Sequence, residues 1–214
     1  MNTETTTGST ALIAILGGLT NGQAPSIGRC LYDAGFRALV VPLGSPDPLG
    51  TVAALRSALP ADCVVGAAMV ATVDQVRRCH EAGARLIVSP NSDAAVIAQT
   101  VRLGMEGLPG AATPGEAFAA ITAGAGAVSV FPAQQVGTVG LRAWAAVIPK
   151  GTGLVPVGGV DASNIRGWRE AGATGFGIGS ALFTPGIAVA ELHRRAVCMT
   201  GALELALAST RLPA

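Results

Sequence analysis

The sequence predicts an α/β protein built as one (β/α)8 barrel. Eight short apolar runs start 20 to 27 residues apart, and the stretches between them are long enough for helices. Most runs are continuously apolar, which is typical of parallel strands buried on both faces. Eight such units in 214 residues indicate a compact barrel. A doubly wound sheet is the alternative, although it usually has fewer strands at this length.

Sequence signals for the starts and ends of helices support the successive strand–helix units. Thr20, Thr72 and Thr113 each follow an apolar run and have Gln or Glu three residues later, as in a helix capping box. Ala-Gly pairs that can end helices precede the second, fourth, sixth and eighth runs. The eight runs are residues 12–16, 38–41, 63–67, 86–89, 106–108, 127–131, 154–157 and 175–178. We expect residues 1–10 to form a polar tail and residues 11–214 to form the single barrel domain.

Composition excludes several classes of function. Only 13% of residues are charged, against about 25% in an average domain, so a disordered chain is excluded. A net charge of +1 argues against nucleic-acid and membrane-surface binding. The sequence has no apolar stretch of membrane-spanning length and no secretory signal, and its four cysteines are too far apart for a knuckle or redox motif. We therefore expect a cytoplasmic protein with no membrane or nucleic-acid partner.

Two glycine-rich loops predict an anion site. In a barrel of this kind, function lies in the loops after the strands, and phosphate is commonly held after strands seven and eight. Gly158 and Gly159 follow the seventh run, and Gly179 and Ser180 follow the eighth. Glycines let backbone N–H groups approach a phosphate, and a following helix N-terminus would add a favourable dipole. These four residues are the candidate site for a small anionic metabolite, although tight turns alone also use such glycines.

Other polar residues of the mouth favour structural roles. The eight strand-end loops contain no Lys, Arg or His, and we expect their carboxylates to cap helices or shape turns. The two histidines are isolated on helices, so no metal site and no cofactor are expected. The carboxylates in question are Asp47, Asp93, Glu116 and Asp161.

At the strand ends the sequence resembles the 2-keto-3-deoxy-6-phosphogluconate and -phosphogalactonate aldolases. The matching pieces are LIAILGG at 12–18, VPLGSP at 41–46, LIVSPN at 86–91, PGAAT at 109–113, VFP at 130–132, VGGV at 157–160 and GS at 179–180. The resemblance implies a (β/α)8 barrel, usually trimeric and cytosolic, that cleaves a phosphorylated keto-deoxy sugar acid to pyruvate and glyceraldehyde 3-phosphate. It also implies a mouth lined by Pro90, Thr113, Phe131 and Pro132.

The family chemistry implied by this resemblance needs a lysine for a Schiff base, a glutamate for proton transfer and an arginine for the substrate carboxylate. Ser129 stands at the lysine position, Val41 at the glutamate position and Gly17 at the arginine position. A threonine usual in the family is replaced by Met69. The sole lysine, Lys150, precedes the seventh run, about 15 Å from the mouth across a five-residue strand.

Three hypotheses follow. The first is a diverged member that has lost Schiff-base aldolase activity but keeps an anion cradle. The second is a different, metal-assisted or lyase-type enzyme on the same barrel, which would use Asp47, Asp93 and Asp161. The third is a non-catalytic structural subunit that packs with an active paralogue in a trimer. By resemblance alone, we expect a homotrimer.

Overall fold

The computed structural model describes residues 12–209. The strands are β1 (Leu12–Ile15), β2 (Ala38–Pro42), β3 (Val64–Ala68), β4 (Leu86–Val88), β5 (Glu106–Leu108), β6 (Gly110–Ala111), β7 (Ala127–Val130), β8 (Gly153–Pro156) and β9 (Phe176–Ile178). The helices are α1 (Ala24–Asp33), α2 (Pro48–Ala58), α3 (Val73–Glu81), α4 (Ala94–Arg102), α5 (Pro114–Thr122), α6 (Ala133–Val147), α7 (Ile165–Glu170) and α8 (Val189–Ser209), with a short 3-10 helix η1 (Asn21–Gln23).

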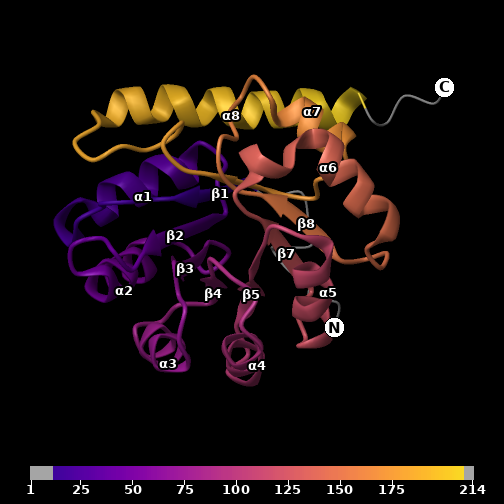
Figure 1. Cartoon of the computed structure of the whole chain (residues 1–214). Coiled ribbons are helices and arrows are strands. Elements are labelled where there is room, and N and C mark those ends of the chain that lie inside the picture. Colours follow the sequence, from indigo (N-terminus) through magenta and orange to yellow (C-terminus); the bar gives the residue numbers. More distant parts are fainter. Residues whose placement is uncertain (1–11, 210–214) are drawn as a thin grey trace.

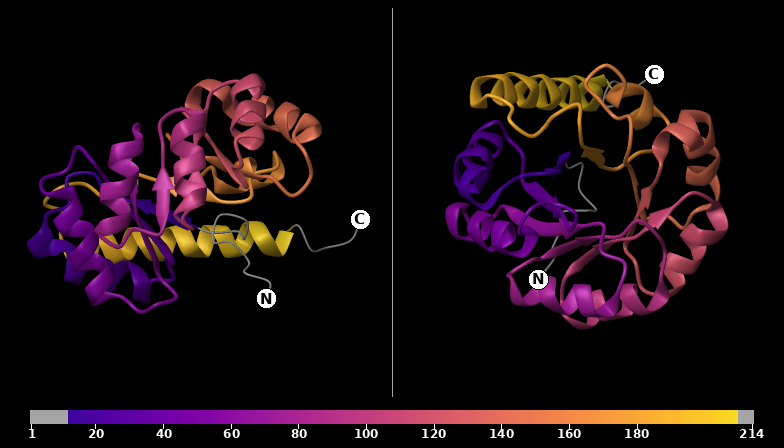
Figure 2. Two further views of the ribbon diagram at one scale, coloured as in Figure 1. Left: turned by 90° about the horizontal axis from the view of Figure 1, so that it is seen from below. Right: turned by 60° about the vertical axis from the view of Figure 1, so that its left-hand side comes forward.

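The strands form a curled parallel sheet with the helices outside it (Figure 1). Six strands pair in the order β5-β4-β3-β2-β1-β9, and three pair in the order β6-β7-β8. The predicted fifth run forms β5, and Pro109, which has no N–H to donate to a ladder, separates it from the two-residue strand β6. The helices surround the strands in a ring, and α8 packs against both α1 and α7 (Figure 2). The predicted α/β class with parallel strands is confirmed.

Two contacts bridge the gaps between the two sets of strands. The Ser129 N–H donates to the Pro109 carbonyl oxygen at 2.8 Å, which links β7 to the end of β5. Val157, just after β8, pairs in parallel with Gly177 of β9. Strand pairing therefore continues locally past both interruptions.

Apolar side chains pack on both faces of the sheet. Ile13, Ala38 and Val40 belong to an inner cluster enclosed by the curled strands. Leu39 and Val41, their neighbours along the chain, belong to the larger cluster between the strands and the helices. Successive side chains of a strand point to opposite faces, so each strand-end residue has a definite side. This alternation decides which residues can line the mouth.

The predicted helix boundaries are largely confirmed. Thr72 and Thr113 form complete capping boxes at the starts of α3 and α5. The glycines of all four Ala-Gly pairs have φ between +89° and +110°. Thr20 differs from the prediction, because its hydroxyl donates to the Gln23 side chain at 2.8 Å ahead of η1 instead of capping a backbone N–H. No helix within residues 12–209 is long and apolar enough to cross a membrane.

Burial separates the thiols by reactivity. Desolvation raises the pKa of both Cys63 and Cys79 to about 11, whereas Cys198 is exposed. At pH 8 the buried thiols then hold on the order of a hundredfold less thiolate than a thiol in water. We expect 5,5′-dithiobis(2-nitrobenzoate) to label Cys198 fast and the three buried thiols of Cys30, Cys63 and Cys79 slowly, with the rate for Cys63 and Cys79 rising toward pH 11. A Cys198→Ser variant that keeps the fast phase would contradict this.

Candidate functional site

The two glycine loops line one cavity of about 460 Å³ at the carboxyl ends of the strands. Gly158 and Gly159 have φ of +105° and +70°, a backbone conformation that side chains disfavour. Gly179 and Ser180 face the same cavity from the loop after β9. The structure therefore brings the four predicted cradle residues together.

Peptide N–H groups are the main donors at this cavity. Within residues 12–209, the backbone N–H groups of Gly158, Gly179, Ser180 and Ala181 donate to no acceptor. Successive free N–H groups around a concavity are a recurrent anion-binding arrangement. The geometry can accept an anion without a charged side chain.

The predicted contribution of helix dipoles is wrong. After Gly159 the chain makes a turn, and the six-residue α7 begins only at Ile165. After Ser180 the chain runs through turns until α8 begins at Val189. Neither glycine loop opens directly into a helix, so the cradle depends on peptide N–H groups alone.

Gln134 is a site residue that the loop analysis missed, because it lies on α6 rather than in a glycine loop. Its side chain lies over the Gly158-Gly159 turn. The amide satisfies both of its ends when Nε2 donates to the Gly158 carbonyl at 3.1 Å and Oε1 accepts from the Gly159 N–H at 3.3 Å. Gln134 thus holds the turn and engages one of the predicted donors.

Asp161 adds a negative charge to the cavity lining. It does not cap α7 with its side chain as predicted, because Oδ1 accepts from the Ser163 N–H at 2.8 Å and from the Ser163 hydroxyl at 2.6 Å. Asn164 is the N-cap residue of α7, and its Oδ1 accepts from the Asp161 N–H at 3.0 Å. The carboxylate therefore shapes a turn beside the cradle and opposes anions there.

A second cavity, of about 120 Å³, shares lining residues with the first and is bordered by strand ends. Its lining residues are Ile15, Pro42, Ala68, Met69, Val88, Ser89, Pro90, Ser129, Phe131 and Val157. Ile15 and Val157 line both cavities. The second cavity is almost wholly apolar, and among the described residues no charged side chain lines it.

Three of the residues that stand at functional positions of the resembled family lie at or near the ends of strands. Ser129 is 1% exposed and lines the apolar cavity. Gly17 follows β1, where an added Cβ would meet only Pro42, at 4.0 Å. Met69 lies at the same cavity, half exposed, with φ of +61°.

The assignment of Val41 to the mouth is wrong. Its side chain packs in the outer cluster under the helices, because it lies one residue out of phase with the inner face. Val40 packs in the inner cluster, and Pro42 lines the apolar cavity. The inward residues in this half of β2 are therefore Val40 and Pro42, which flank Val41, and neither can transfer a proton.

The other predicted mouth residues divide into two groups. Pro90 and Phe131 line the apolar cavity. Thr113 and Pro132 line neither cavity, since Thr113 caps α5 and Pro132 is the N-cap residue of α6. Lys150 is exposed in the turn just before β8, at the amino end of the strands, as predicted.

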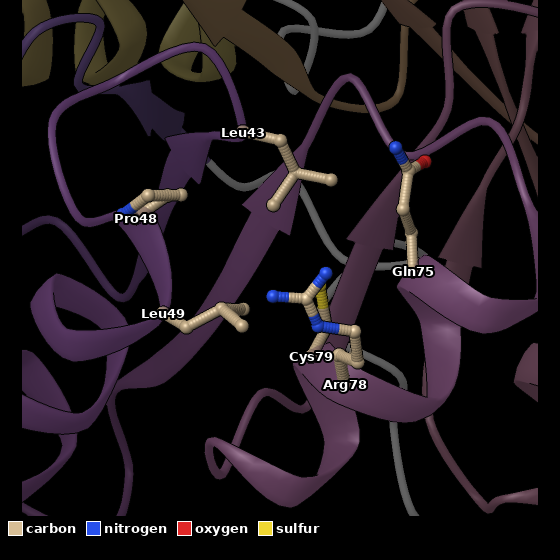
Figure 3. Close-up of a pocket in the computed structure, with 6 residues that line it drawn as sticks. All are labelled: Leu43, Pro48, Leu49, Gln75, Arg78 and Cys79. Carbon is tan, nitrogen blue, oxygen red and sulfur yellow. The ribbon is translucent and has the colours of Figure 1, made fainter.

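A separate pocket of about 180 Å³ lies between α2 and α3. Figure 3 shows the Arg78 guanidinium reaching into it beneath Leu43, beside Leu49 and the buried Cys79. Gln75 also borders it, with Oε1 committed to the capping box of α3. Arg78 lines neither mouth cavity, so it supplies no cation to the cradle.

The remaining carboxylates have structural roles. Asp47 and Asp93 cap α2 and α4, accepting from the Gly50 N–H at 3.2 Å and the Val96 N–H at 2.9 Å. Hydrogen bonds from the Ala112 N–H and from Thr113 lower the pKa of Glu116 at the start of α5. Residues 12–209 contain no group of three His, Cys, Asp or Glu side chains placed to hold a metal ion.

Comparison with known proteins gives a consistent answer. A family model described as KDPG and KHG aldolase matches residues 5–204. A probable 2-dehydro-3-deoxy-6-phosphogalactonate aldolase of Rhizobium meliloti is 39% identical over 90% of this chain and 91% of its own length. The Escherichia coli 2-dehydro-3-deoxy-6-phosphogalactonate aldolase is 37% identical over 89% of this chain and 93% of its own.

The structural comparison agrees with these matches. A solved structure titled as native KDPGal superposes with a TM-score of 0.90 at 36% identity. It covers 92% of this chain and 96% of the other. The family match spans most of the sequence, and the curled parallel sheet agrees with it. The chain belongs to the KDPG and KHG aldolase family.

Proposed function

We propose that this chain is a diverged aldolase-family protein that binds a small phosphorylated or otherwise anionic metabolite and does not use Schiff-base chemistry. The observation that carries the proposal is Ser129, buried at the end of β7 where the family resemblance expects a lysine. Serine cannot form an imine with a ketone, and Lys150, the sole lysine, lies at the other end of the strands. The cradle of Gly158, Gly159, Gly179 and Ser180 is the proposed anion site.

The architecture that we propose with it is a closed (β/α)8 barrel in one domain over residues 11–214. The Val157–Gly177 pairing and the Ser129–Pro109 hydrogen bond support closure, because they lie at the two interruptions of the sheet. The family resemblance supports a cytoplasmic homotrimer, and residues 1–10, which lie outside the described residues, are proposed to form a polar tail.

Inorganic phosphate is the simplest test of the cradle. With peptide N–H donors and no cation, we expect a millimolar Kd, roughly −4 kcal/mol, measured by NMR titration with shifts at Gly158, Gly179 and Ser180. Absence of binding at tens of millimolar phosphate would refute the proposed function. So would shifts confined to residues far from the glycine loops.

Two substitutions that change the charge of the cavity lining test whether phosphate binds at the glycine loops. Asp161→Asn removes the carboxylate of the lining and should tighten phosphate binding roughly threefold. Gly179→Asp places a carboxylate where an added Cβ meets open space, and should weaken phosphate binding more than about tenfold. Gly44→Asp is the matched control, because its Cβ also meets open space but it lines neither cavity. Equal Kd values for Gly179→Asp and Gly44→Asp would exclude this cavity as the site.

A further inference from the structure

We propose that the pocket between α2 and α3 is a second binding site, which takes a small aliphatic carboxylate. Arg78 and Gln75 hold the carboxylate group, and the apolar side chains of the lining cover the hydrocarbon part. None of the described residues that line this pocket also lines a cavity of the mouth. The inference therefore goes beyond the proposed anion cradle and does not depend on it.

Arg78 supplies a positive charge that no carboxylate among the described residues neutralises. Its guanidinium reaches into the pocket (Figure 3). In the part of the chain that the structure describes, it forms no hydrogen bond or ion pair, although Asp74 and Glu81 lie four and three residues away on α3. Arg166 and Glu170 on α7, at the same four-residue spacing, do pair at 2.8 Å. Because the Arg78 guanidinium pairs with neither neighbour, its donors are available to an anion from outside the chain.

Gln75 adds a second donor. Its Oε1 accepts from the Ala71 N–H at 2.8 Å and from the Thr72 N–H at 3.2 Å, which fixes the orientation of the amide. Its Nε2 donates to no acceptor among the described residues. Figure 3 shows Nε2 on the side of Leu43 and Oε1 on the far side. The nitrogen atoms that Gln75 and Arg78 present are therefore all donors, and they suit a negatively charged acceptor.

The rest of the lining favours a hydrocarbon group beside the anion. Leu43, Pro48 and Leu49 are partly exposed, and the two leucines pack against the main hydrophobic cluster. Covering these side chains removes apolar surface from water, which is favourable. Cys79 is buried, and desolvation raises the pKa of its thiol to about 11. Cys79 therefore adds a neutral wall and no nucleophile.

The two halves of the lining select the ligand class. A carboxylate is planar and accepts two parallel hydrogen bonds from one guanidinium, and an attached alkyl chain can lie on the leucine wall. Inorganic phosphate has the charge but no hydrocarbon, and an alkyl amide has the hydrocarbon but no charge. Because Arg78 is exposed to solvent, its charge is partly screened, so we expect a Kd in the millimolar range.

Four probes test the pocket by NMR titration of the intact protein: isovalerate, acetate, isovaleramide and inorganic phosphate. We expect isovalerate to shift the amide signals of Leu43, Leu49 and Gln75. Acetate lacks the branched chain and should bind at least about fivefold more weakly, since each buried CH₂ group changes the affinity by roughly fourfold. Isovaleramide keeps the shape without the charge and should bind at least about tenfold more weakly. Phosphate should leave Leu43 and Leu49 unshifted.

The Arg78→Gln variant tests the cation. It removes the charge and keeps part of the side-chain stem, and we expect isovalerate binding to weaken at least about tenfold. Arg77→Gln is the matched control, because it makes the same change at the next residue of α3, which is exposed and does not line the pocket. We expect its Kd for isovalerate to stay within about twofold of the unchanged protein.

Gln75→Glu tests the second donor without removing the helix cap. Glu116 makes the same cap on α5, where its Oε2 accepts from the Ala112 and Thr113 N–H groups at 2.8 and 2.9 Å. A glutamate at residue 75 can therefore keep the capping box while its other oxygen replaces the donor and attracts Arg78. We expect isovalerate binding to be lost. Circular dichroism and thermal unfolding check that each variant is folded.

The outcomes separate this site from the anion cradle. Loss of isovalerate binding in Arg78→Gln but not in Arg77→Gln supports the proposal. No binding at tens of millimolar isovalerate, equal binding of acetate, or equal losses in the two arginine variants would overturn it. So would isovalerate shifts confined to Gly158, Gly179 and Ser180, or a change in the oligomeric mass of Arg78→Gln, which would show that a second copy of the chain fills the pocket. Phosphate shifts at the glycine loops decide the proposed function separately.

Discussion

Purified protein treated with pyruvate and sodium borohydride is expected to show no mass increase, and it should cleave neither phosphorylated keto-deoxy acid of the family. The covalent step needs an amine at the end of β7, and Ser129 has a hydroxyl there. Val40 and Pro42, the inward residues in this half of β2, can move no proton, and Gly17 offers no side-chain donor to a carboxylate. Each of these tasks contributes orders of magnitude in rate, so the expected loss exceeds about 10⁴-fold.

Restoring the lysine, glutamate and arginine of the family chemistry by substitution is the complementary experiment. Ser129→Lys alone should permit slow imine formation with pyruvate, detected as a borohydride-trapped adduct on the new lysine. Adding Val40→Glu and Gly17→Arg should raise turnover, because Val40 packs inside the curled strands and a Cβ at Gly17 would meet only Pro42, at 4.0 Å. Val41→Glu is the matched control, since its carboxylate would enter the apolar layer under the helices and supply no base.

Folding must be verified before inactivity of the triple variant is interpreted. A carboxylate at residue 40 is buried in the inner cluster unless the new lysine or arginine pairs with it, and an unpaired one costs several kcal/mol. Circular dichroism and thermal unfolding of each variant provide the check. A reduced pyruvate adduct on Lys150 of the unchanged protein, or turnover that depends on Lys150, would overturn the assignment.

Gly66→Ala is expected to be the most destabilising methyl addition in the sheet. A Cβ at Gly66 in the middle of β3 would overlap the Leu86 carbonyl oxygen and lie 2.8 Å from Leu86 Cβ. Those atoms belong to the paired strand β4, so the overlap can be relieved only by parting the strands. We expect the free energy of unfolding in urea to fall by about 3 kcal/mol or more.

Gly44→Ala is the control for this measurement. Its added Cβ meets nothing within 4 Å, and its φ lies outside the left-handed region. We expect its free energy of unfolding to change by less than about 0.5 kcal/mol. Equal midpoints for Gly66→Ala and Gly44→Ala would mean that β3 and β4 can shift apart without cost.

The α/β class and many of the helix boundaries follow from local chemistry. A continuous apolar run is stable as a strand only where both faces are covered, and Ala-Gly after a helix has one favourable backbone conformation. Gly35, Gly83, Gly124 and Gly172 adopt it at the predicted places. The capping boxes at Thr72 and Thr113 depend on residues three apart, so the chain specifies them before it folds.

Contacts between residues far apart in the sequence determine which side chains line the site. Continuous apolar runs have no alternation, so the sequence could not tell that Val40 faces inward and Val41 outward; the pairing of β2 with β1 and β3 settles it. Gln134 reaches the Gly158-Gly159 turn only because α6 begins beside the end of β8. Ser89 and Ser129 line one apolar cavity because curling of the sheet brings the ends of β4 and β7 to the same space. Such proximity depends on the curvature of the sheet, which no local stretch of sequence specifies.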